Sequence, residues 1–240
     1  MLACVLSPLG GSGKTTVALN TARAGVLAGK KVLAVELDFS PGSFRSLLQI
    51  ERGKALAGAV NAENWQDFVA KTHYGFDVLP AGLPDRSEHV DLVPYRDFLK
   101  RALSVYDYVV VDTPPTVHYL VSETVSNFSA LNLIVIPGIR GLEGVKRTAE
   151  WAEFLKLKGV LKTGTIVLNQ FPRKLVWAVG EVLEYPIGAS LPETKELRQT
   201  PVNDEIARQL APLLGLEVVP ERKGLFSFLM RKGGIAVAKQ

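Results

Sequence analysis

The sequence predicts one α/β domain, a doubly wound, mostly parallel sheet with helices on both faces. Runs rich in Val, Ile and Leu, such as YVVVD at 108–112 and LNLIVI at 131–136, alternate along the chain with segments of helical periodicity. Uninterrupted apolar runs of this kind are typical of parallel strands that are buried on both faces. The 240 residues are 47% hydrophobic and 22% charged, and no linker or internal repeat divides them, which favours a single large core.

The first half of the chain alternates between strand and helix patterns. LACVL at 2–6 predicts the first strand, and a glycine-rich turn separates it from a helix at 14–27. KVLAVEL at 31–37 predicts the second strand, because it is an apolar run of strand length. The remaining elements expected here are short helices at 42–49 and 62–71, a strand at 76–79 and a helix at 92–104.

The second half continues the same rhythm. The strand at 108–112 is of the fully buried type, and a helix at 119–127 follows it. The strand at 131–136 leads into a helix at 142–156. Strands at 163–168 and 187–191 and a helix at 202–214 complete a domain of residues 1–218, and residues 219–240 form a separate basic, amphipathic tail.

The segment SPLGGSGKTT, residues 7–16, follows the first strand directly and is typical of a phosphate-binding loop. Its glycines let backbone N–H groups approach phosphate oxygens closely, and the next helix adds the positive end of its dipole. Lys14 supplies a positive charge for the β- and γ-phosphates, and Thr15 supplies a hydroxyl for Mg²⁺. The residues expected to contact the nucleotide are Gly10, Gly11, Ser12, Gly13, Lys14, Thr15 and Thr16.

Two further strand ends carry carboxylates. Asp112 ends the buried run VVVD and is placed to hold Mg²⁺ through a water molecule, although an Asp can also simply end a strand. Glu36 and Asp38 lie two residues apart at the end of the second strand, so their side chains share one face. A carboxylate there can position an attacking water or contact the metal shell, while Glu36 could also be a salt-bridged strand residue. Ligands of such sheets bind at the carboxyl ends of the strands, where all these groups fall.

The loop sequence resembles the deviant Walker A pattern of the MinD/ParA family of P-loop ATPases, KGGxGK[ST]. Leu9 stands where that family has a lysine, which reaches across a dimer to the partner's nucleotide. The resemblance covers most of the chain and implies a P-loop NTPase fold, ATP and Mg²⁺ as ligands, and a homodimer. It implies catalytic roles for Lys14 and Asp38, the latter orienting the hydrolytic water. It also implies metal contacts for Thr15, Asp38 and Asp112.

The resemblance further indicates where the base would bind. Asn169 in VLNQF ends an apolar strand, at a place where the family has an Asn that reads the adenine edge. Its amide offers both the donor and the acceptor that adenine requires, and a turn Asn is the alternative. Pro192 in LPETKEL matches a proline in the family's loop beside the base. No NKxD-type guanine motif is present, so ATP is expected in preference to GTP.

Composition excludes several other classes of protein. The single cysteine, Cys4, lies in the first apolar run and is expected to be buried, which indicates a reducing compartment without disulfides. Iron-protein-like reductases and the nickel-insertion and arsenite-pump relatives depend on cysteines that this chain lacks. The three histidines show no metal-ligand spacing, and we expect no signal peptide and no membrane-spanning helix. The net charge of +4 suits anionic lipid or nucleic acid equally.

The tail contains a second informative segment, ERKGLFSFLMRKGG at 221–234. On a helix, Leu225, Phe226, Phe228, Leu229 and Met230 would cover one broad face, and basic residues within Lys223–Lys232 flank it. A short basic amphipathic helix of this kind lies flat in a membrane interface. The segment also resembles the C-terminal membrane-targeting sequence of the MinD branch. The alternatives are a helix packed on the domain's own core or on a partner protein.

We therefore expect a MinD-like, Mg²⁺-dependent ATPase that cycles on and off the membrane to position a division site, flagellum or pilus. It would be cytoplasmic and peripherally membrane-associated, with slow turnover stimulated by a protein partner. One alternative is a ParA-type partition ATPase that binds DNA nonspecifically, and another is a nucleotide-binding scaffold with little hydrolysis. A small-molecule kinase is a more distant alternative, because no second site for an acceptor is evident. The basic residues that could contact DNA are Arg140, Lys146, Arg147, Lys156, Lys158, Arg173 and Lys174.

Overall fold

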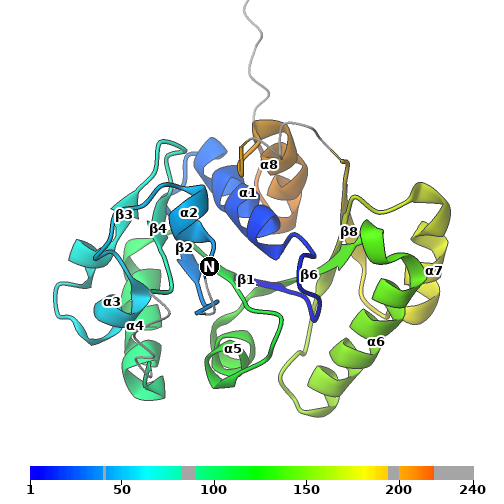
Figure 1. Cartoon of the computed structure of the whole chain (residues 1–240), viewed down its shortest axis with the longest axis horizontal. Helices are drawn as coiled ribbons and strands as arrows, with labels where there is room; N and C mark the ends of the chain where they lie inside the picture. The colour runs from blue at the N-terminus through cyan, green and yellow to red at the C-terminus, as the bar shows by residue number, and fades with distance from the viewer. Residues whose placement is uncertain (40–41, 83–89, 194–199, 219–240) are drawn as a thin grey trace, which may run out of the picture.

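The computed structural model describes residues 1–39, 42–82, 90–193 and 200–218, and its centre is an eight-stranded sheet in the order β3-β4-β2-β5-β1-β6-β7-β8 (Figure 1). All neighbouring strands are parallel except β3, which runs antiparallel to β4. This arrangement confirms the predicted fold class. The strands are β1 Leu2–Leu6, β2 Val32–Glu36, β3 Ala70–Lys71, β4 Asp77–Leu79, β5 Tyr108–Asp112, β6 Leu131–Pro137, β7 Thr165–Asn169 and β8 Ile187–Leu191.

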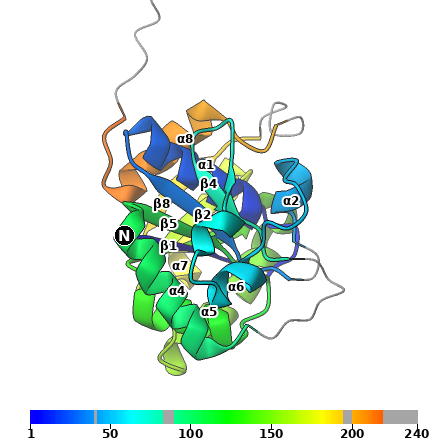
Figure 2. The ribbon, with the colours of Figure 1, turned by 90° about the vertical axis from the view of Figure 1, so that its left-hand side faces the viewer.

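Helices cover both faces of the sheet. Figures 1 and 2 show α1 and α8 on one side and α4 and α5 on the other, with α6 on the side of α5. The helix α7 packs beside α6 at the β8 end of the molecule. The α-helices are α1 Lys14–Leu27, α2 Phe44–Leu47, α3 Leu56–Asn61, α4 Leu92–Val105, α5 Tyr119–Glu123, α6 Gly141–Leu157, α7 Val176–Val182 and α8 Asp204–Leu210.

Each face of the sheet has its own hydrophobic core, because successive strand residues point to opposite sides. In β1, Leu2, Cys4 and Leu6 belong to the core that α4, α5 and α6 cover. Val5 belongs to the opposite core, together with Val17 of α1. The uninterrupted apolar runs of the sequence are thus explained by burial on both faces, as predicted.

The prediction of a helix at 62–71 is wrong. Trp65–Phe68 forms a short 3-10 turn, and the chain then enters β3. Trp65 is buried, and its ring meets Phe98 of α4 edge-on, with ring centroids 5.4 Å apart. This tertiary contact fixes the local backbone, so the weak helical pattern does not decide it. The helices α3 and α7 were not predicted. The predicted helix at 119–127 is too long, because α5 ends at Glu123 and a π-helical turn follows at Thr124–Phe128.

The position of β1 determines where a ligand can bind. β1 lies in the centre of the sheet, between β5 and β6. The chain leaves β1 for strands on the β5 side and returns later to build the β6 side, and such a reversal opens a crevice at the carboxyl ends of the strands. The glycine-rich loop lies at this point, between β1 and α1.

The predicted boundary at residue 218 and the amphipathic tail are not tested by the structure, because residues 219–240 lie outside the described residues. Among the residues that are described, no helix combines the length and the apolar composition needed to cross a bilayer.

Candidate nucleotide-binding site

The glycine-rich loop has a backbone that only glycine adopts easily. Gly11 has a φ of +68° and Gly13 a φ of +89°, both in the left-handed region. Gly13 also lies against β7, because a Cβ atom built on it would come within 2.2 Å of Nδ2 of Asn169. By contrast, a Cβ on Gly10 would meet nothing within 4 Å. The loop therefore needs glycine at position 13 for two independent reasons.

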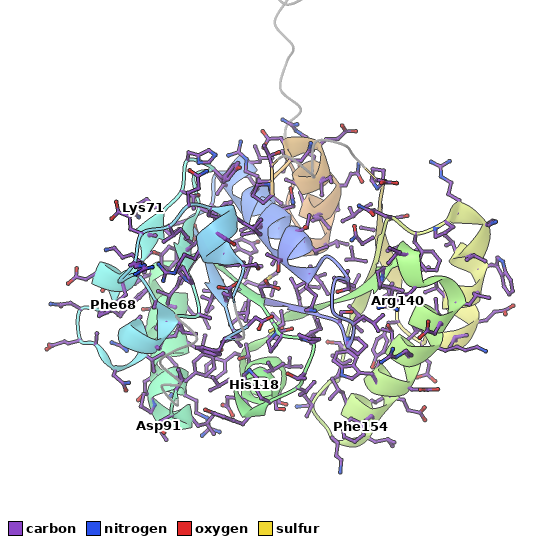
Figure 3. All side chains as sticks on the ribbon, viewed as in Figure 1. Phe68, Lys71, Asp91, His118, Arg140 and Phe154 are labelled. Atoms are coloured by element: carbon purple, nitrogen blue, oxygen red, sulfur yellow. The ribbon has the colours of Figure 1, made fainter. Side chains whose placement is uncertain are left out.

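A cavity of about 610 Å³ opens beside this loop, a volume within the usual range for small-molecule sites. Three chain segments meet there: the loop itself, the end of β2 and the segment that follows β5. One of the lining residues is His118, which precedes α5 (Figure 3). The cavity is lined by Gly10, Gly11, Ser12, Gly13, Lys14, Thr15, Leu37, Asp38, Phe39, Thr113, Pro114, Pro115, Thr116 and His118.

Lys14 is largely buried at the start of α1, and its Nζ donates a hydrogen bond to the carbonyl oxygen of Leu9 at 3.2 Å. Burial lowers the pKa of Lys14, and the negative charges of Asp112 and Asp38 oppose that shift. An ammonium group has three donors, so this lysine can bind phosphate oxygens in addition to the carbonyl.

Thr15 and Asp112 form the part of the site suited to a metal ion. Thr15 Oγ1 donates a hydrogen bond to Asp112 Oδ2 at 2.7 Å, although the two residues are 97 positions apart. The other carboxylate oxygen, Oδ1, is buried and has no hydrogen-bond partner among the described residues. Burial raises the pKa of Asp112 to about 7; the hydrogen bond from Thr15 and the charge of Lys14 counteract the rise, and Glu36 adds to it.

These features fit Mg²⁺. A buried carboxylate oxygen without a partner and a hydroxyl beside it are hard oxygen ligands, which this ion prefers. A divalent cation there would also favour the ionised carboxylate of Asp112, because opposite charges stabilise each other at short range. Asp112 and Thr15 are thus the residues that would hold the ion. The metal contacts expected for Thr15, Asp38 and Asp112 stay predictions.

Glu36 is buried, and its carboxylate accepts hydrogen bonds from backbone N–H groups, with no ion pair to any residue that the structure describes. Oε1 accepts the backbone N–H groups of Ser43 and Phe44, and Oε2 accepts the N–H of Ala81 at 3.2 Å. Burial raises the pKa of Glu36, whereas these backbone donors lower it. A Cβ at Gly42 would come within 2.3 Å of Oε2, so the loop after β2 lies tightly against this carboxylate.

The other predicted residues take different places. Asp38 lines the cavity with Lys14. Its role in orienting a water molecule stays a prediction. Asn169 donates a hydrogen bond from Nδ2 to the carbonyl oxygen of Ser12 at 2.9 Å, so it braces the loop from β7. Thr16 lies in the first turn of α1, and Pro192 is exposed after β8. Neither Thr16 nor Pro192 lines the cavity. Adenine contacts by Asn169 and Pro192 stay predictions.

The side chain of Leu9 lies inside the molecule. It is only 4% exposed, and its Cδ1 lies 3.6 Å from the position of a Cβ built on Gly144 of α6. The residue that replaces the family's lysine therefore packs against α6. Sequence reasoning missed Ser43 and His118, which lie next to Thr15 and in the cavity wall. No motif marks either residue, since both arrive through the folding of their loops.

Comparison with known proteins supports a nucleotide-binding fold. A model of the AAA domain family matches residues 3–162. The chain is 30% identical over 178 residues to an uncharacterized ATP-binding protein of Methanocaldococcus jannaschii, covering 72% of this chain and 65% of that protein. It is 33% identical over 138 residues to the chromosome-partitioning ATPase Soj of Treponema pallidum, covering 53% of each. The chain thus spans less than two thirds of the length of either relative.

A solved structure with a similar fold is the septum site-determining protein MinD of Pyrococcus horikoshii, in complex with Mg-ADP. The TM-score is 0.66 at 24% identity, and the alignment covers 88% of both chains. Identity at this level establishes similarity of fold, while function has to be argued from the residues of the site.

Proposed function

Because the chain belongs to the AAA domain family and to the MinD/ParA group of P-loop ATPases, we propose that it is an Mg²⁺-dependent ATPase that binds an anionic membrane in its ATP-bound, dimeric form. The observation that carries the enzymatic part is the meeting of four side chains. Lys14 and Asp38 line one cavity with Thr15, and Asp112 accepts a hydrogen bond from Thr15 Oγ1 at 2.7 Å.

Each of these residues has a role that its chemistry supports. Lys14 and the loop N–H groups neutralise and hold the phosphates. Thr15 and Asp112 hold Mg²⁺, which when bound supplies positive charge to the β- and γ-phosphates. Asp38, a carboxylate in the cavity wall, orients the water that attacks the γ-phosphate.

Slow turnover is part of the proposal. With Leu9 buried against α6, position 9 offers no cation to a nucleotide in a partner subunit. Fewer positive groups then stabilise the negative charge on the γ-phosphate in the transition state. In phosphoryl-transfer enzymes, a cationic side chain supplied by a partner can contribute strongly to this stabilisation. A protein partner that completes the site would therefore accelerate hydrolysis.

Membrane binding is argued from the sequence of residues 219–240, which lie outside the described residues. Each large apolar side chain contributes about 1.5–3 kcal/mol when fully buried, and each basic residue about 1 kcal/mol near an anionic surface. Ordering the backbone costs about 1 kcal/mol or more per residue. One tail would thus bind weakly and reversibly, while two tails on a dimer would bind far more tightly through effective concentration. Hydrolysis that separates the dimer would release the membrane.

The test is co-sedimentation of the full chain with vesicles of anionic lipid in ATP and in ADP, with phosphate release measured in parallel. We expect pelleting in ATP, little in ADP, and Mg²⁺-dependent phosphate release. Phe228→Asp, on the expected apolar face, should abolish pelleting, whereas Ser227→Asp, on the opposite face, should leave most of it. Equal pelleting of both variants would contradict a membrane-bound apolar face, and equal pelleting in ATP and ADP would contradict the switch.

The chromosome-partitioning name of the Treponema relative favours a second candidate, partitioning with DNA as the partner. Of the basic residues that could form a patch, Arg147 pairs with Glu143 and Lys156 pairs with Glu184. Arg140 lies at the start of α6, whereas Lys156 lies in its last turn, two residues after Phe154, so these basic residues are spread along the helix (Figure 3). ATP-dependent DNA binding that falls steeply with salt would support this candidate, and its absence at low salt would remove it.

A further inference from the structure

We propose that Ser43 supplies a second hydroxyl ligand to the Mg²⁺ site, beside Thr15. The inference rests on the proposed function, because it concerns the ion that accompanies the nucleotide. Its starting point is a distance: Ser43 Oγ lies 3.2 Å from Thr15 Oγ1, although the two residues are 28 positions apart. The loop after β2 thus brings an unassigned hydroxyl to the residue that is expected to hold the ion.

The two hydroxyls form one hydrogen-bonded chain with the carboxylates of the site. Thr15 Oγ1 donates its hydrogen to Asp112 Oδ2 at 2.7 Å. Thr15 Oγ1 is therefore left to accept from Ser43 Oγ at 3.2 Å, and Ser43 Oγ also lies 3.3 Å from Glu36 Oε1. Each hydroxyl oxygen keeps lone-pair capacity for a cation, because a hydroxyl has two acceptor lone pairs beside its one donor.

The separation of the two oxygens suits one coordination shell. Neighbouring ligands around an octahedral Mg²⁺ are about 2.9 Å apart, because each Mg–O bond is about 2.05 Å long. The 3.2 Å between the hydroxyl oxygens of Ser43 and Thr15 differs from this value by a few tenths of an ångström. Both oxygens could therefore contact one ion after a small adjustment of either side chain.

Ser43 is held in this position by buried groups. Its backbone N–H and that of Phe44 both donate to Oε1 of Glu36, and the Phe44 side chain is fully buried. Glu36 in turn is fixed by the N–H of Ala81. Glu36 is therefore a positioning residue, since it places Ser43 without lining the cavity itself.

The hydroxyl of Ser43 is also spared from its usual local role. Ser43 occupies the N-cap position of α2, where a serine side chain commonly accepts a backbone N–H of the first turn. Here the side chain makes no such capping bond. Instead it points to Thr15 and Glu36, which is the arrangement expected of a group that serves the site.

The test measures the affinity of a fluorescent ADP for the full chain as the Mg²⁺ concentration is varied, which needs no turnover. We expect Ser43→Ala to raise the half-saturating Mg²⁺ concentration about tenfold or more, the range seen when groups around a metal are removed. Affinity for ADP in EDTA should be unchanged. Ser43→Thr, which keeps a hydroxyl, should stay near wild type. Ser46→Ala is the matched control, because the hydroxyl of this exposed serine of α2 donates to the carbonyl oxygen of Ser43, away from the two site hydroxyls.

The outcomes distinguish the role of Ser43 from the proposed function as a whole. If the wild-type chain binds ADP with a Mg²⁺ dependence that Ser43→Ala leaves unchanged, the role of Ser43 is overturned and the proposed function stands. If the wild-type chain shows no Mg²⁺ dependence at all, the proposed function fails, and this inference fails with it. A loss of ADP affinity in EDTA as well would show that Ser43 acts on the loop and not on the metal, which also overturns it.

Discussion

Replacing glycines of the phosphate-binding loop by alanine should produce a graded loss of stability that follows the local geometry. At Gly10 the φ angle is outside the left-handed region and an added Cβ meets nothing within 4 Å. Gly10→Ala should therefore change the free energy of unfolding by about 0.5 kcal/mol or less. At Gly11 the space is equally open, but φ is +68°. Gly11→Ala should cost about 1–2 kcal/mol, the penalty of a left-handed residue with a Cβ.

Gly13→Ala should be the most damaging of the three. It carries the same left-handed penalty, with φ at +89°, and its Cβ would come within 2.2 Å of the Asn169 amide nitrogen. The amide must move and lose its hydrogen bond to the Ser12 carbonyl oxygen, which is 2.9 Å long. That bond contributes about 0.5–1.5 kcal/mol. The sum is about 1.5–3.5 kcal/mol, and for a chain of this size each kcal/mol lowers Tm by about 2–4 °C.

Thermal unfolding without nucleotide, followed by circular dichroism, measures the series. The double variant Gly13→Ala/Asn169→Ala tests the cause. Because both single changes lose the same hydrogen bond and the shorter side chain removes the clash, the double variant should cost less than the sum of the singles. A Tm for Gly13→Ala equal to that of Gly10→Ala would refute the geometric argument. Strict additivity in the double variant would refute the contact with Asn169.

Three further predictions concern other parts of the domain. Leu9→Lys, which restores the family's lysine, should lower Tm, because an ammonium group cannot stay in the apolar contact with α6 that the buried Leu9 makes. Leu9→Met, which keeps an apolar side chain, should leave Tm unchanged. A Leu9→Lys enzyme that is as stable as wild type and hydrolyses ATP faster would contradict the inward orientation. Burial raises the pKa of the Cys4 thiol to about 12, so iodoacetamide at pH 8 should label it only as fast as the chain unfolds, and rapid labelling of native protein would show that β1 is accessible. Arg96 donates two hydrogen bonds to the buried Glu123 and holds its pKa below the usual value. Their contribution to stability should be complete above the unfolded pKa of about 4.3 and lost as pH falls through the lower folded pKa. Glu123→Gln should thus be less stable than wild type at pH 7, with the difference shrinking below pH 4, and a difference independent of pH would contradict this account.

The sequence by itself determined most of the sheet and the phosphate-binding loop. Strand β5 and strand β8 have the predicted bounds, as does helix α1, because apolar runs and helical periodicity are local signals. The glycines of the loop are also a local signal, because a tight turn between a strand and a helix requires them. That Asp112 meets Thr15 follows from one general rule, that the ends of parallel strands share an edge of the sheet.

Only the tertiary structure decided where individual side chains point. Leu9 turns inward, is only 4% exposed, and lies beside Gly144 of α6. Glu36 binds backbone because the loop after β2 folds back over it. Ser43 reaches Thr15 through that same loop, across 28 residues. Each of these outcomes depends on contacts between segments that are distant in the chain, and their energies outweigh local preferences that differ by less than about 1 kcal/mol. Periodicity carries no information about such contacts. The sequence pattern therefore predicted which strand ends carry the candidate site, while packing between loops decided which groups its side chains contact.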